Sequence, residues 1–542
     1  MQKVLTAEEM REVDRLTTAK YGIPSILLME NAAHAAARVI TEKLGGSVAG
    51  KSFLILCGKG NNGGDGAALA RILWMQGANI DVYLFGMVEE TKGEARVNFE
   101  ILKKLKNDLA RDESLLLFHE EERPDWWRKR MTPLHSVDVV VDALFGTGLT
   151  RPIEEPLRKV IESHWFGEKA FRDSASLTVA LDIPSGLDSN LSQQIGGNTL
   201  VDLTVTFTAP KLANVLPPAA NFNGELIVAN IGSPQELIDA SDSQTYLAEM
   251  QDAVDWLEKS EFSSASYKNK RGHALLVAGS NNYAGAAVLA GNAAIVSGVG
   301  LVTIATAESA QNSIASRVLP EVMTRGVIET ESGAAALEAF DEIDEFIEKS
   351  IDAVLIGSGL SSSDESTKKL VKKLVEERQT PVVIDADGLN ALAPFELQGS
   401  NDLPLVLTPH EGEFLKLLGT KDKDALKDRV AVAREFARKH QVILVLKGER
   451  ALIAAPDGRV VINPTGNSGL GKAGNGDTLA GIITGFAAQA AQIKIDMFET
   501  VVAAVYTAGL AGDIAAEKYG KRSMLASDVR ECLGEAFERI TN

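Results

Sequence analysis

Short apolar runs alternate with segments of helical spacing along most of the chain. In the first half such runs occupy 52–57 (SFLILC), 80–86 (IDVYLFG) and 177–181 (LTVAL), and 66–77 (GAALARILWMQG) has apolar residues at helical intervals. Continuous runs rich in Val, Ile and Leu, separated by helices, are typical of a parallel sheet buried on both faces. We therefore predict an α/β fold in which 52–86 form a β-α-β unit with a right-handed crossover.

The pattern is interrupted once. Residues 232–269 are polar and charged and contain no buried-strand run, after which the alternation resumes with HALLVAGS, TPVVIDADG and QVILVLKG. The runs 451–456 (ALIAAP) and 460–466 (VVINPTG) flank Asp457-Gly458 and predict a hairpin. The chain from Thr478 onward has helical spacing throughout. We predict two α/β domains, 1–235 and 236–542.

Two segments need to be distinguished from targeting or membrane segments. The opening MQKVLTAEEMREVD lacks an apolar core, and Thr6 with Glu9 predicts a capped helix rather than a signal peptide. Residues 272–307 contain no formally charged residue but do contain three asparagines, which a bilayer would penalise. We predict a buried β-α-β unit there.

Composition narrows the class of protein. Hydrophobic residues make up 45% and charged residues 24%, as in an ordinary globular protein. Two cysteines, Cys57 and Cys532, cannot form a disulfide framework, which favours a reducing, cytoplasmic location. The formal charge of -19 argues against general affinity for nucleic acid or anionic membranes. We expect small-molecule substrates, no nucleic-acid or membrane partner, and a homo-oligomer.

A glycine-rich turn, GKGNNGGDG (58–66), follows the strand run 52–57 and precedes a helix. Backbone amides at such a position can hold a dinucleotide phosphate, helped by the partial positive charge of the helix start. The third glycine falls one position late for the GxGxxG fingerprint. A plain glycine-rich turn is the alternative for this motif by itself.

Acidic side chains follow two further predicted strands. Asp142 ends VVVD, and Asp182 with Ser185 lies in LDIPSGLD. Any one of these could be only a turn or cap residue. In an open parallel sheet, however, ligands lie beyond the carboxyl ends of the strands. We therefore expect Asn62, Asp65, Asp142, Asp182 and Ser185 to converge on one crevice.

These motifs, with MREVDRL (10–16) and YGIPSILLMENAA (21–33), resemble the epimerase domain of bifunctional NAD(P)H-hydrate repair enzymes, a Rossmann-like three-layer domain. The resemblance implies that Asp182 does acid/base work, and that potassium is bound by Asn62, Asp142 and Ser185. It implies a hydrate-binding set of Asn61, Asn62, Gly63, Gly64, Asp65, Gly146, Thr147, Gly148, Leu149, Thr150, Arg151, Pro152 and Asp182. Carboxylate, carbonyl and hydroxyl oxygens suit a hard cation.

The most informative stretch of the second half is TGNSGLGKAGNGDTLAGII (465–483). It has P-loop spacing, but Ala473 stands where that motif needs Ser or Thr to hold magnesium. The better unit is GNGD (474–477), which opens an apolar helix. Amides there can neutralise a transferred phosphoryl group, and Asp477 can take a proton from an attacking hydroxyl. The alternative is a helix N-cap.

This half resembles the ribokinase-like superfamily, and within it the NAD(P)H-hydrate dehydratase domain. The supporting motifs are AGSNNYAGAAVLAGNAA, IGSGL, VVIDADGLNAL, TPHEGEF and LKGER. The resemblance implies Asp477 as base, ADP or alternatively ATP as co-substrate, and magnesium. It implies hydrate binding by Ala287, Gly359, His410 and Asp477, and nucleotide binding by Lys447, Gly448, Glu449, Arg450, Ala451 and Gly476.

The sequence departs from that family at three places, NSGL (467–470), GNGD (474–477) and TPHEGE (408–413), but keeps the glycines and Asp477. We expect a two-domain repair enzyme that acts on NADHX and NADPHX: an isomerase that interconverts their R and S epimers, joined to a lyase that dehydrates the S epimer. Two alternatives remain open, a ribokinase-like small-molecule kinase and a first domain that serves only as a binding or scaffold module.

Overall fold

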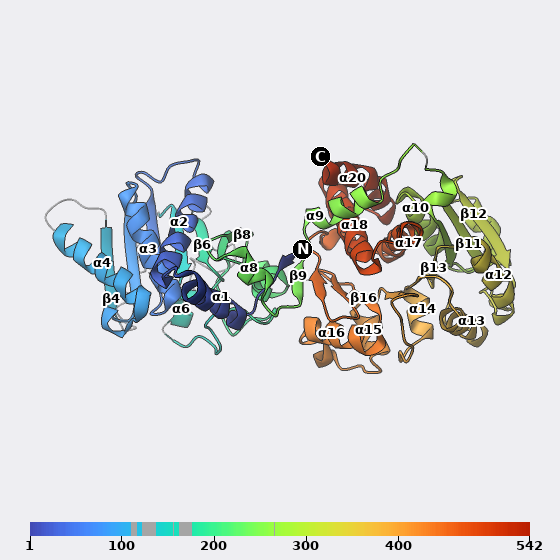
Figure 1. The fold of residues 1–542 in the computed structure, drawn as a ribbon, viewed down its shortest axis with the longest axis horizontal. Helices are drawn as coiled ribbons and strands as arrows, with labels where there is room; N and C mark the ends of the chain where they lie inside the picture. The colour runs from blue at the N-terminus through green and yellow to red at the C-terminus, as the bar shows by residue number, and fades with distance from the viewer. Residues whose placement is uncertain (110–115, 122–136, 156, 162–175, 265) are drawn as a thin grey trace. The chain divides into compact units, whose positions relative to one another are not determined.

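The computed structural model describes residues 1–109, 116–121, 137–155, 157–161, 176–264 and 266–542 (Figure 1). They form two compact units, one of Lys3–Ser243 and the other of Met1–Gln2 with Gln244–Asn542. Each unit contains one sheet with helices packed against it. The predicted α/β class is confirmed.

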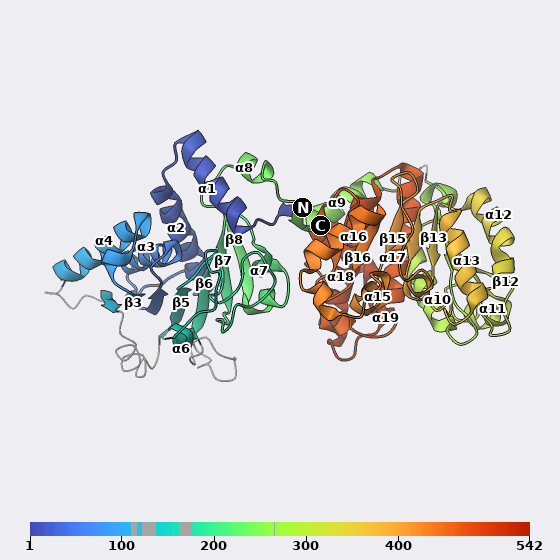
Figure 2. The same cartoon turned by 90° about the horizontal axis from the view of Figure 1, so that it is seen from below.

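The sheet of the first unit has seven strands in the order β4-β3-β2-β5-β6-β7-β8, and every neighbouring pair is parallel. Figure 2 shows β5, β6, β7 and β8 side by side. The chain moves outward in opposite directions from β2 and from β5, so their junction is the switch point where open α/β sheets bind ligands. The strands are β2 (Ser52–Cys57), β3 (Asn79–Phe85), β4 (Leu116–Glu121), β5 (Val139–Ala143), β6 (Leu177–Leu181), β7 (Leu203–Phe207) and β8 (Glu225–Ala229).

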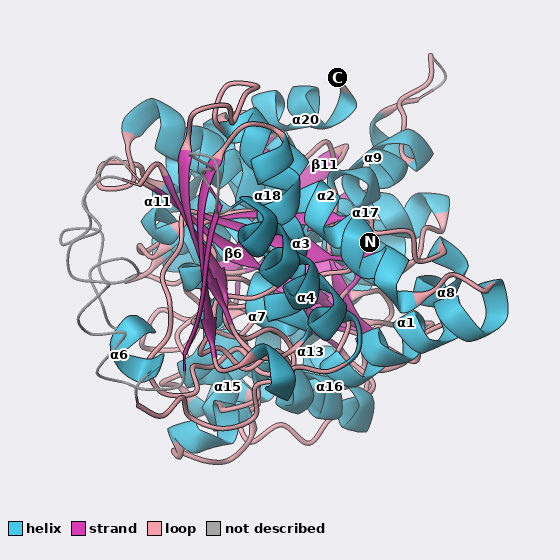
Figure 3. Cartoon of the chain, turned by 90° about the vertical axis from the view of Figure 1, so that its left-hand side faces the viewer, coloured by secondary structure: helices cyan, strands magenta, loops and turns pink. Residues whose placement is uncertain are grey.

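Helices cover both faces of this sheet, which confirms the three-layer prediction. Phe53 and Ile55 of β2 pack on the face under α2 (Ser25–Lys43), α3 (Asn61–Met75) and α4 (Gly93–Leu109). Leu54 and Leu56 pack toward the opposite face, where α6 (Leu157–Ile161) lies (Figure 3). The shorter helices are η1 (Val88–Glu90), α7 (Leu212–Val215) and η2 (Ala219–Phe222).

Helix α1 (Ala7–Tyr21) begins at the predicted cap, where the Thr6 side chain accepts from the Glu9 amide and the Glu9 carboxylate accepts from the Thr6 amide. It buries Met10 and Val13 together with Leu237 and Ile238 of α8 (Gln235–Asp239). The first part of the polar segment 232–269, up to Ser243, therefore belongs to the first unit, and the remainder belongs to the second. For this reason the units divide between residues 243 and 244, whereas the boundary expected from the sequence lay between 235 and 236.

The sheet of the second unit has eleven strands in the order β1-β9-β18-β17-β16-β15-β14-β13-β10-β11-β12. The strands from β12 to β16 along this order are parallel, and β17 and β18 form the predicted antiparallel hairpin. The edge strand β1 comes from the start of the chain. The strands are β1 (Gln2–Lys3), β9 (Thr245–Leu247), β10 (His273–Val277), β11 (Leu301–Ala307), β12 (Val322–Val327), β13 (Ala353–Ile356), β14 (Val382–Ile384), β15 (Leu405–Leu407), β16 (Ile443–Leu446), β17 (Leu452–Ala454) and β18 (Val460–Ile462).

Three long helices, α10 (Ala284–Val296), α17 (Asn475–Ile493) and α18 (Met497–Tyr519), pack into one core with this sheet (Figure 1). A Cβ at Gly481 would lie 2.2 Å from the Ala290 carbonyl oxygen, so glycine permits the close contact of α17 with α10. The other helices are α9 (Met250–Lys259), η3 (Lys268–Arg271), α11 (Glu308–Ala315), η4 (Leu337–Ala339), α12 (Phe340–Ser350), α13 (Glu365–Glu376), α14 (Ala386–Ala391), α15 (Glu411–Leu417), η5 (Lys423–Leu426), α16 (Arg429–His440), η6 (Ser468–Leu470), α19 (Ala526–Glu531) and α20 (Leu533–Thr541).

The uncharged segment 272–307 forms β10, α10 and β11, which confirms the predicted β-α-β unit. Within the described residues, α18 is the one helix long and apolar enough to cross a membrane, and most of it is buried inside the unit. Its apolar character is accounted for by the core that it shares with α17 and α10.

Candidate active sites

The first unit contains a cavity of about 620 Å³ at the carboxyl ends of its strands. Residues after β2, β5, β6 and β7 line it, together with residues of α1 and α2. This is the switch point of the sheet, as the strand order requires. Of the predicted hydrate-binding residues, the cavity lining includes Asn61, Asn62, Asp65, Gly146, Thr147, Gly148, Leu149 and Asp182.

The glycines of GKGNNGGDG allow backbone segments to approach each other closely. A Cβ at Gly58 would lie 2.0 Å from the Leu144 carbonyl oxygen, and one at Gly63 would lie 1.8 Å from the Gly58 carbonyl oxygen. Helix α3 begins at Asn61, so the turn is shorter than the sequence suggested. The absence of side chains at these glycines therefore lets β2, α3 and the loop after β5 lie in close contact at the cavity wall.

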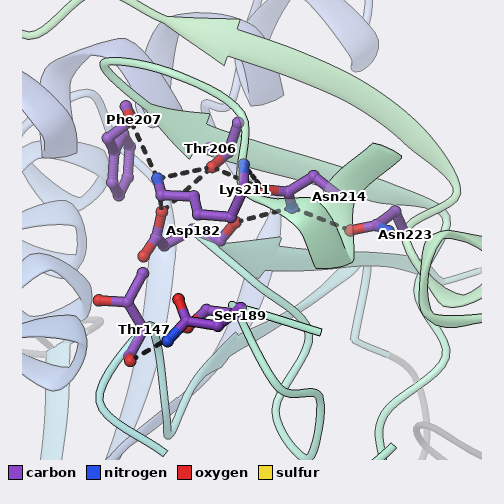
Figure 4. A network of polar contacts seen from close by, with 9 residues as sticks. Thr147, Asp182, Ser189, Thr206, Phe207, Lys211, Asn214 and Asn223 are labelled. Atoms are coloured by element: carbon purple, nitrogen blue, oxygen red, sulfur yellow. Dashed lines mark hydrogen bonds and ion pairs between the residues drawn. The ribbon is translucent and has the colours of Figure 1, made fainter. Parts of the chain in front are cut away.

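Asp182 is held by a buried lysine (Figure 4). The Lys211 ammonium, 1% exposed, donates to Asp182 Oδ1 at 2.5 Å and to Thr206 Oγ1 and the Phe207 carbonyl at 3.0 Å each. All three ammonium donors are thus used inside the protein. Asp182 has a φ of 66°, a left-handed conformation that is costly for a residue other than glycine and that clusters at functional sites.

Asp142 and Ser185 are joined in a network of hydrogen bonds. The Asp142 carboxylate accepts from the Ser185 amide at 2.8 Å, the Ser185 hydroxyl at 2.7 Å, the Thr199 hydroxyl at 2.7 Å and the Leu144 amide at 3.1 Å. Burial raises the pKa of Asp142, and these hydrogen bonds oppose that rise. In the described part of the chain, no lysine, arginine or histidine forms an ion pair with this buried carboxylate.

Asn62 is buried, and neither its side-chain oxygen nor its nitrogen has a hydrogen-bond partner. A Cβ at Gly146 would lie 3.5 Å from Asn62 and 3.2 Å from Asp182 Oδ2. Gly146, in the loop after β5, is therefore close to both side chains. An unpartnered buried amide oxygen such as that of Asn62 is a group that suits a cation ligand. Thr150, Arg151 and Pro152, also predicted to bind the hydrate, do not line the cavity.

Three polar residues had no role in the sequence-based assignment: Lys211 and Asp14, which line this cavity, and Asn214, which contacts Asp182. Lys211 follows β7. A charged residue soon after a predicted strand was the signal that identified Asp182, and the same signal was available for Lys211. Asp14 lies on α1, where burial and then the charge of Asp182 raise its pKa to about 6, with Lys211 opposing. Asn214 donates to the Asp182 carbonyl at 3.2 Å. For Asp65, burial and the charges of Asp182 and Asp14 raise the pKa well above its usual range.

The second unit brings predicted residues together at the ends of four adjacent parallel strands. Lys447, after β16, donates to Asp385 Oδ1 at 2.8 Å, and Thr408, after β15, donates to the same oxygen at 2.7 Å. Burial lowers the pKa of Lys447, but the charges of Asp385, Glu413 and Asp477 outweigh it and raise the pKa. A buried ammonium is thus stabilised in the cationic form beside Asp477.

Asp477 lies in the first turn of α17, as predicted. Burial and then the charge of Asp385 raise its pKa to about 6, opposed by the nearby Ser358 hydroxyl and the Lys447 ammonium. A carboxylate with a pKa near the working pH is suited to general base catalysis. No side-chain cap bond is formed at the helix start, so the N-cap alternative for Asp477 is not supported.

The other predicted hydrate-binding residues lie near this site in different ways. His410 caps α15, accepting at Nδ1 from the Gly412 amide at 3.0 Å, and most of its ring is exposed. Gly359 follows β13 and accepts at its carbonyl from the Ser280 hydroxyl at 2.9 Å. Ala287 is fully buried in α10, and a Cβ at Gly279 would lie 3.0 Å from it. The Ala287 side chain therefore packs inside the unit, and its part in hydrate binding stays a prediction.

The predicted nucleotide-binding residues divide between a loop and a helix start. Lys447–Ala451 connect β16 to β17, and a Cβ at Gly476 would lie 3.4 Å from Lys447 Nζ, so both segments face the ammonium. In this loop, Gly448 packs on the Arg429 guanidinium. Arg450 is partly buried, and burial lowers its pKa. Lys472 donates to the Met524 carbonyl at 3.0 Å, which ties it to the following loop and agrees with the rejection of a P-loop.

Sequence reasoning named the motifs that carry Asp385 and Glu413 but gave neither residue a role. Both face Lys447, at 2.8 and 3.9 Å. A charged residue directly after a buried strand was the available signal for Asp385. For Glu413, which lies one helical turn from His410, the three-residue spacing of a capping box was the signal.

Comparison with known proteins gives two family-model matches. Residues 25–213 match the model described as YjeF-related protein N-terminus, and residues 274–534 match that described as NAD(P)H-hydrate dehydratase. Curated relatives match over nearly the whole length. One is the bifunctional NAD(P)H-hydrate repair enzyme Nnr of Moorella thermoacetica, 41% identical over 98% of this chain and 96% of its own. Another is the enzyme of the same name from Thermofilum pendens, 36% identical over 99% and 97%.

Among solved structures, the chain is similar to the ADP/ATP-dependent NAD(P)H-hydrate dehydratase from Bacillus subtilis, co-crystallised with ATP and Mg²⁺. The two are 33% identical, and the match covers 52% of this chain and 94% of that one with a TM-score of 0.45. The two family-model matches lie in different structural units, one on each side of residues 243–244.

Proposed function

The chain belongs to the family of bifunctional NAD(P)H-hydrate repair enzymes, and from that premise we propose how its two sites divide the work. The first unit interconverts the R and S epimers of NAD(P)H hydrate, and the second converts the S epimer back to NAD(P)H at the expense of ADP. The observation that carries the proposal is the carboxyl group of Asp477 at the start of α17, whose pKa burial raises to about 6 and on which the charge of the Lys447 ammonium acts.

In the second site, Asp477 accepts the proton of the C6 hydroxyl while that oxygen attacks the β-phosphoryl group of ADP. The bond from phosphorus to the AMP oxygen breaks. The phosphate then leaves C6 with the electron pair of the C6–O bond, and C5 loses a proton, so that the C–H pair forms the C5–C6 double bond of NAD(P)H. The Lys447 ammonium and the first turn of α17, with its partial positive charge, stabilise the phosphoryl group in transit. Asp385 holds the ammonium in place.

In the first site, Asp182 exchanges a proton with the hydrated centre of the substrate. The Lys211 ammonium, held by Thr206 and Phe207, donates to that carboxylate and fixes its orientation in the cavity. Epimerisation needs no nucleotide, so this site can act independently of the second. Because the second site accepts one epimer, the first keeps supplying it.

The test is recovery of NADH absorbance from a mixture of R- and S-NADHX with ADP, magnesium and potassium. We expect conversion of both epimers, with one AMP and one phosphate formed for each NADH. Release of a stable phosphorylated product without NADH would instead establish the small-molecule kinase alternative. Failure to interconvert the epimers, with dehydration intact, would leave the first unit as a binding module.

Potassium in the first unit is part of the proposal. Asn62, Asp142 and Ser185 would hold it, and it would neutralise the buried Asp142 carboxylate and order the loop after β5. We expect epimerisation to fall at least about tenfold when choline replaces potassium, and the thermal midpoint of the first unit to fall as well. Asn62→Ala should show little response of that midpoint to potassium. Equal midpoints of the wild type in both salts would contradict the assignment.

Magnesium and the nucleotide loop complete the proposal for the second unit. Magnesium with ADP would supply the charge neutralisation that phosphoryl transfer requires. A side chain at Gly476 would lie against Lys447 Nζ, in the space where the phosphates are expected. We expect Gly476→Val to weaken ADP binding about tenfold in calorimetry with magnesium, equivalent to about 1.4 kcal/mol.

The matched control for Gly476→Val is Gly471→Val, a more exposed position of the same segment. It should bind ADP as the wild type does. Unchanged ADP affinity in Gly476→Val would place the nucleotide elsewhere. The two buried, free cysteines support a cytoplasmic location as part of this proposal.

A further inference from the structure

The cavity of the first unit contains a second carboxyl group that faces the substrate space from a different direction than Asp182. Asp14 lines this cavity from α1, whereas Asp182 enters it from the end of β6. Helix α1 precedes the segment matched by the family model, which begins at residue 25. Asp14 is therefore outside the part of the chain that the model covers.

The position of Asp14 is fixed by how α1 packs. Met10 and Val13 are buried in the cluster that includes Leu237 and Ile238, and the capping box at Thr6 fixes where the helix starts. One turn after Met10, Asp14 reaches the cavity. Its Oδ1 atom is buried and has no hydrogen-bond partner. A buried carboxyl oxygen without a partner is costly, and such groups are retained where a ligand or a proton transfer uses them.

The charges around Asp14 differ from those around Asp182. The charged groups that act on Asp14 are Lys211 and Asp182, and Asp14 in turn acts on Asp65 of α3. Arg11, Lys59 and Glu94 also line the cavity. The ammonium of Lys211 bonds to Asp182 and leaves no donor for Asp14. The ammonium of Lys211 thus bonds to Asp182 alone of the two carboxyl groups, whereas burial raises the pKa of Asp14.

We propose that Asp14 is a second catalytic residue of the epimerase site, exchanging a proton with the ring nitrogen of the hydrate while Asp182 exchanges one with the C6 hydroxyl. This inference rests on the proposed function of the first unit. Two carboxyl groups in one cavity, one bonded to an ammonium and the other with an unpartnered buried oxygen, differ in their surroundings as acid and base roles require.

Asp182 takes the hydroxyl proton, the O–H electron pair becomes the second C6–O bond, and the C6–N1 bond breaks with its pair remaining on nitrogen. Asp14 donates its proton to that nitrogen. The free aldehyde rotates about C5–C6, and ring closure on the other face reverses both transfers. Each carboxyl ends in the state in which it began, so no co-reactant is consumed.

The test uses the full-length protein without nucleotide and follows interconversion of purified S- and R-NADHX by chromatography. We expect Asp14→Asn to lower kcat at least about fiftyfold, while KM changes less than about threefold. Glu12→Gln is the matched control, because Glu12 lies on the same helix, is exposed and pairs only with Arg15 among the described residues. It should interconvert the epimers at the wild-type rate.

Folding of Asp14→Asn is checked by hydrogen exchange in α1 and α3. A folded variant that keeps more than about a third of the wild-type kcat overturns the inference. If the variant does not fold, the pH profile of Asp14→Glu decides. Because the acid form of Asp14 is required, wild-type kcat/KM should fall as pH rises through about 6. If the pH at which kcat/KM falls is shifted in Asp14→Glu, the result supports the role of Asp14. If that pH is the same as in the wild type, the result overturns it.

A wild-type protein that does not interconvert the epimers would refute the proposed function and this inference with it. A wild type that does so, beside a folded Asp14→Asn variant of equal rate, would refute the inference alone.

Discussion

Asp477→Asn is expected to abolish the recovery of NADH from S-NADHX while leaving epimer interconversion intact. The amide cannot accept the C6 hydroxyl proton, so kcat for dehydration should fall about 1,000-fold or more, within the range for loss of a positioned base. Asparagine keeps the size of the side chain and the neighbouring Lys447–Asp385 pair. ADP affinity measured by calorimetry should therefore change little.

The same substitution should stabilise the second unit. The folded-state pKa of Asp477, about 6, lies above its ordinary value of 3.8, so folded protein holds the proton more tightly and stability declines as pH rises between these values. At pH 7 the ionised Asp477 carboxylate lowers the free energy of unfolding by on the order of 3 kcal/mol, since each pKa unit corresponds to about 1.36 kcal/mol. Removing the charge should raise the thermal midpoint at pH 7 but not at pH 3.

The control for Asp477→Asn is Asp457→Asn, an exposed hairpin residue paired with Arg459. It should leave dehydration unchanged. A variant at Asp477 that retains more than a tenth of wild-type kcat would rule out Asp477 as the base.

Asp182→Asn is expected to stop NADH recovery once the S epimer is spent. With the base removed, enzymatic epimerisation should fall about 1,000-fold, so an R and S mixture gives a fast phase equal to its S content and then only the spontaneous rate. Asn still offers an oxygen to Lys211, but its amide leaves a buried ammonium without a carboxylate partner. We therefore also expect lower stability of the first unit, by roughly 3 kcal/mol.

The amplitude of the fast phase is the decisive measurement, because a stability loss would not set it to the S content. Adding an active epimerase from another source should restore full conversion. Glu225→Gln, an exposed acid of the first unit paired with Lys43, is the control and should convert both epimers. Full conversion by Asp182→Asn at the wild-type rate would exclude its catalytic role.

Sequence reasoning located the sites where a charged residue directly follows a buried strand or opens an apolar helix. Asp142, Asp182 and Asp477 were found in that way, because parallel strands bring their carboxyl ends to one edge. Asp14 gave no such signal. On an amphipathic helix a polar residue ordinarily marks the solvent face. The sequence does not show that Met10 and Val13 pack against α8 in an arrangement where Asp14 lines the cavity.

The domain boundary and the role of the glycines also required the structure. Leu237 and Ile238 are two apolar residues in a polar segment, and nothing in their spacing indicates that they pack against α1, more than two hundred residues earlier in the chain. The glycines at 58 and 63 were interpreted as exposing amides to a phosphate. Their nearest atoms are backbone atoms of the protein, a crowding that residue type alone does not predict.

The edge strand β1 makes the first unit an insertion in the chain of the second. Translation produces β1 before the whole first unit, yet its partner β9 follows that unit, and β9 in turn pairs with β18. Strand β1 therefore has no pairing partner until the first unit and β9 have been synthesised, and β9 itself pairs with β18 only when most of the second unit has been synthesised. A gene fragment that begins at Gln244 would lack β1 and leave β9 as an open sheet edge, a form prone to aggregate. Dissection of the two activities is better done by point substitution than by truncation.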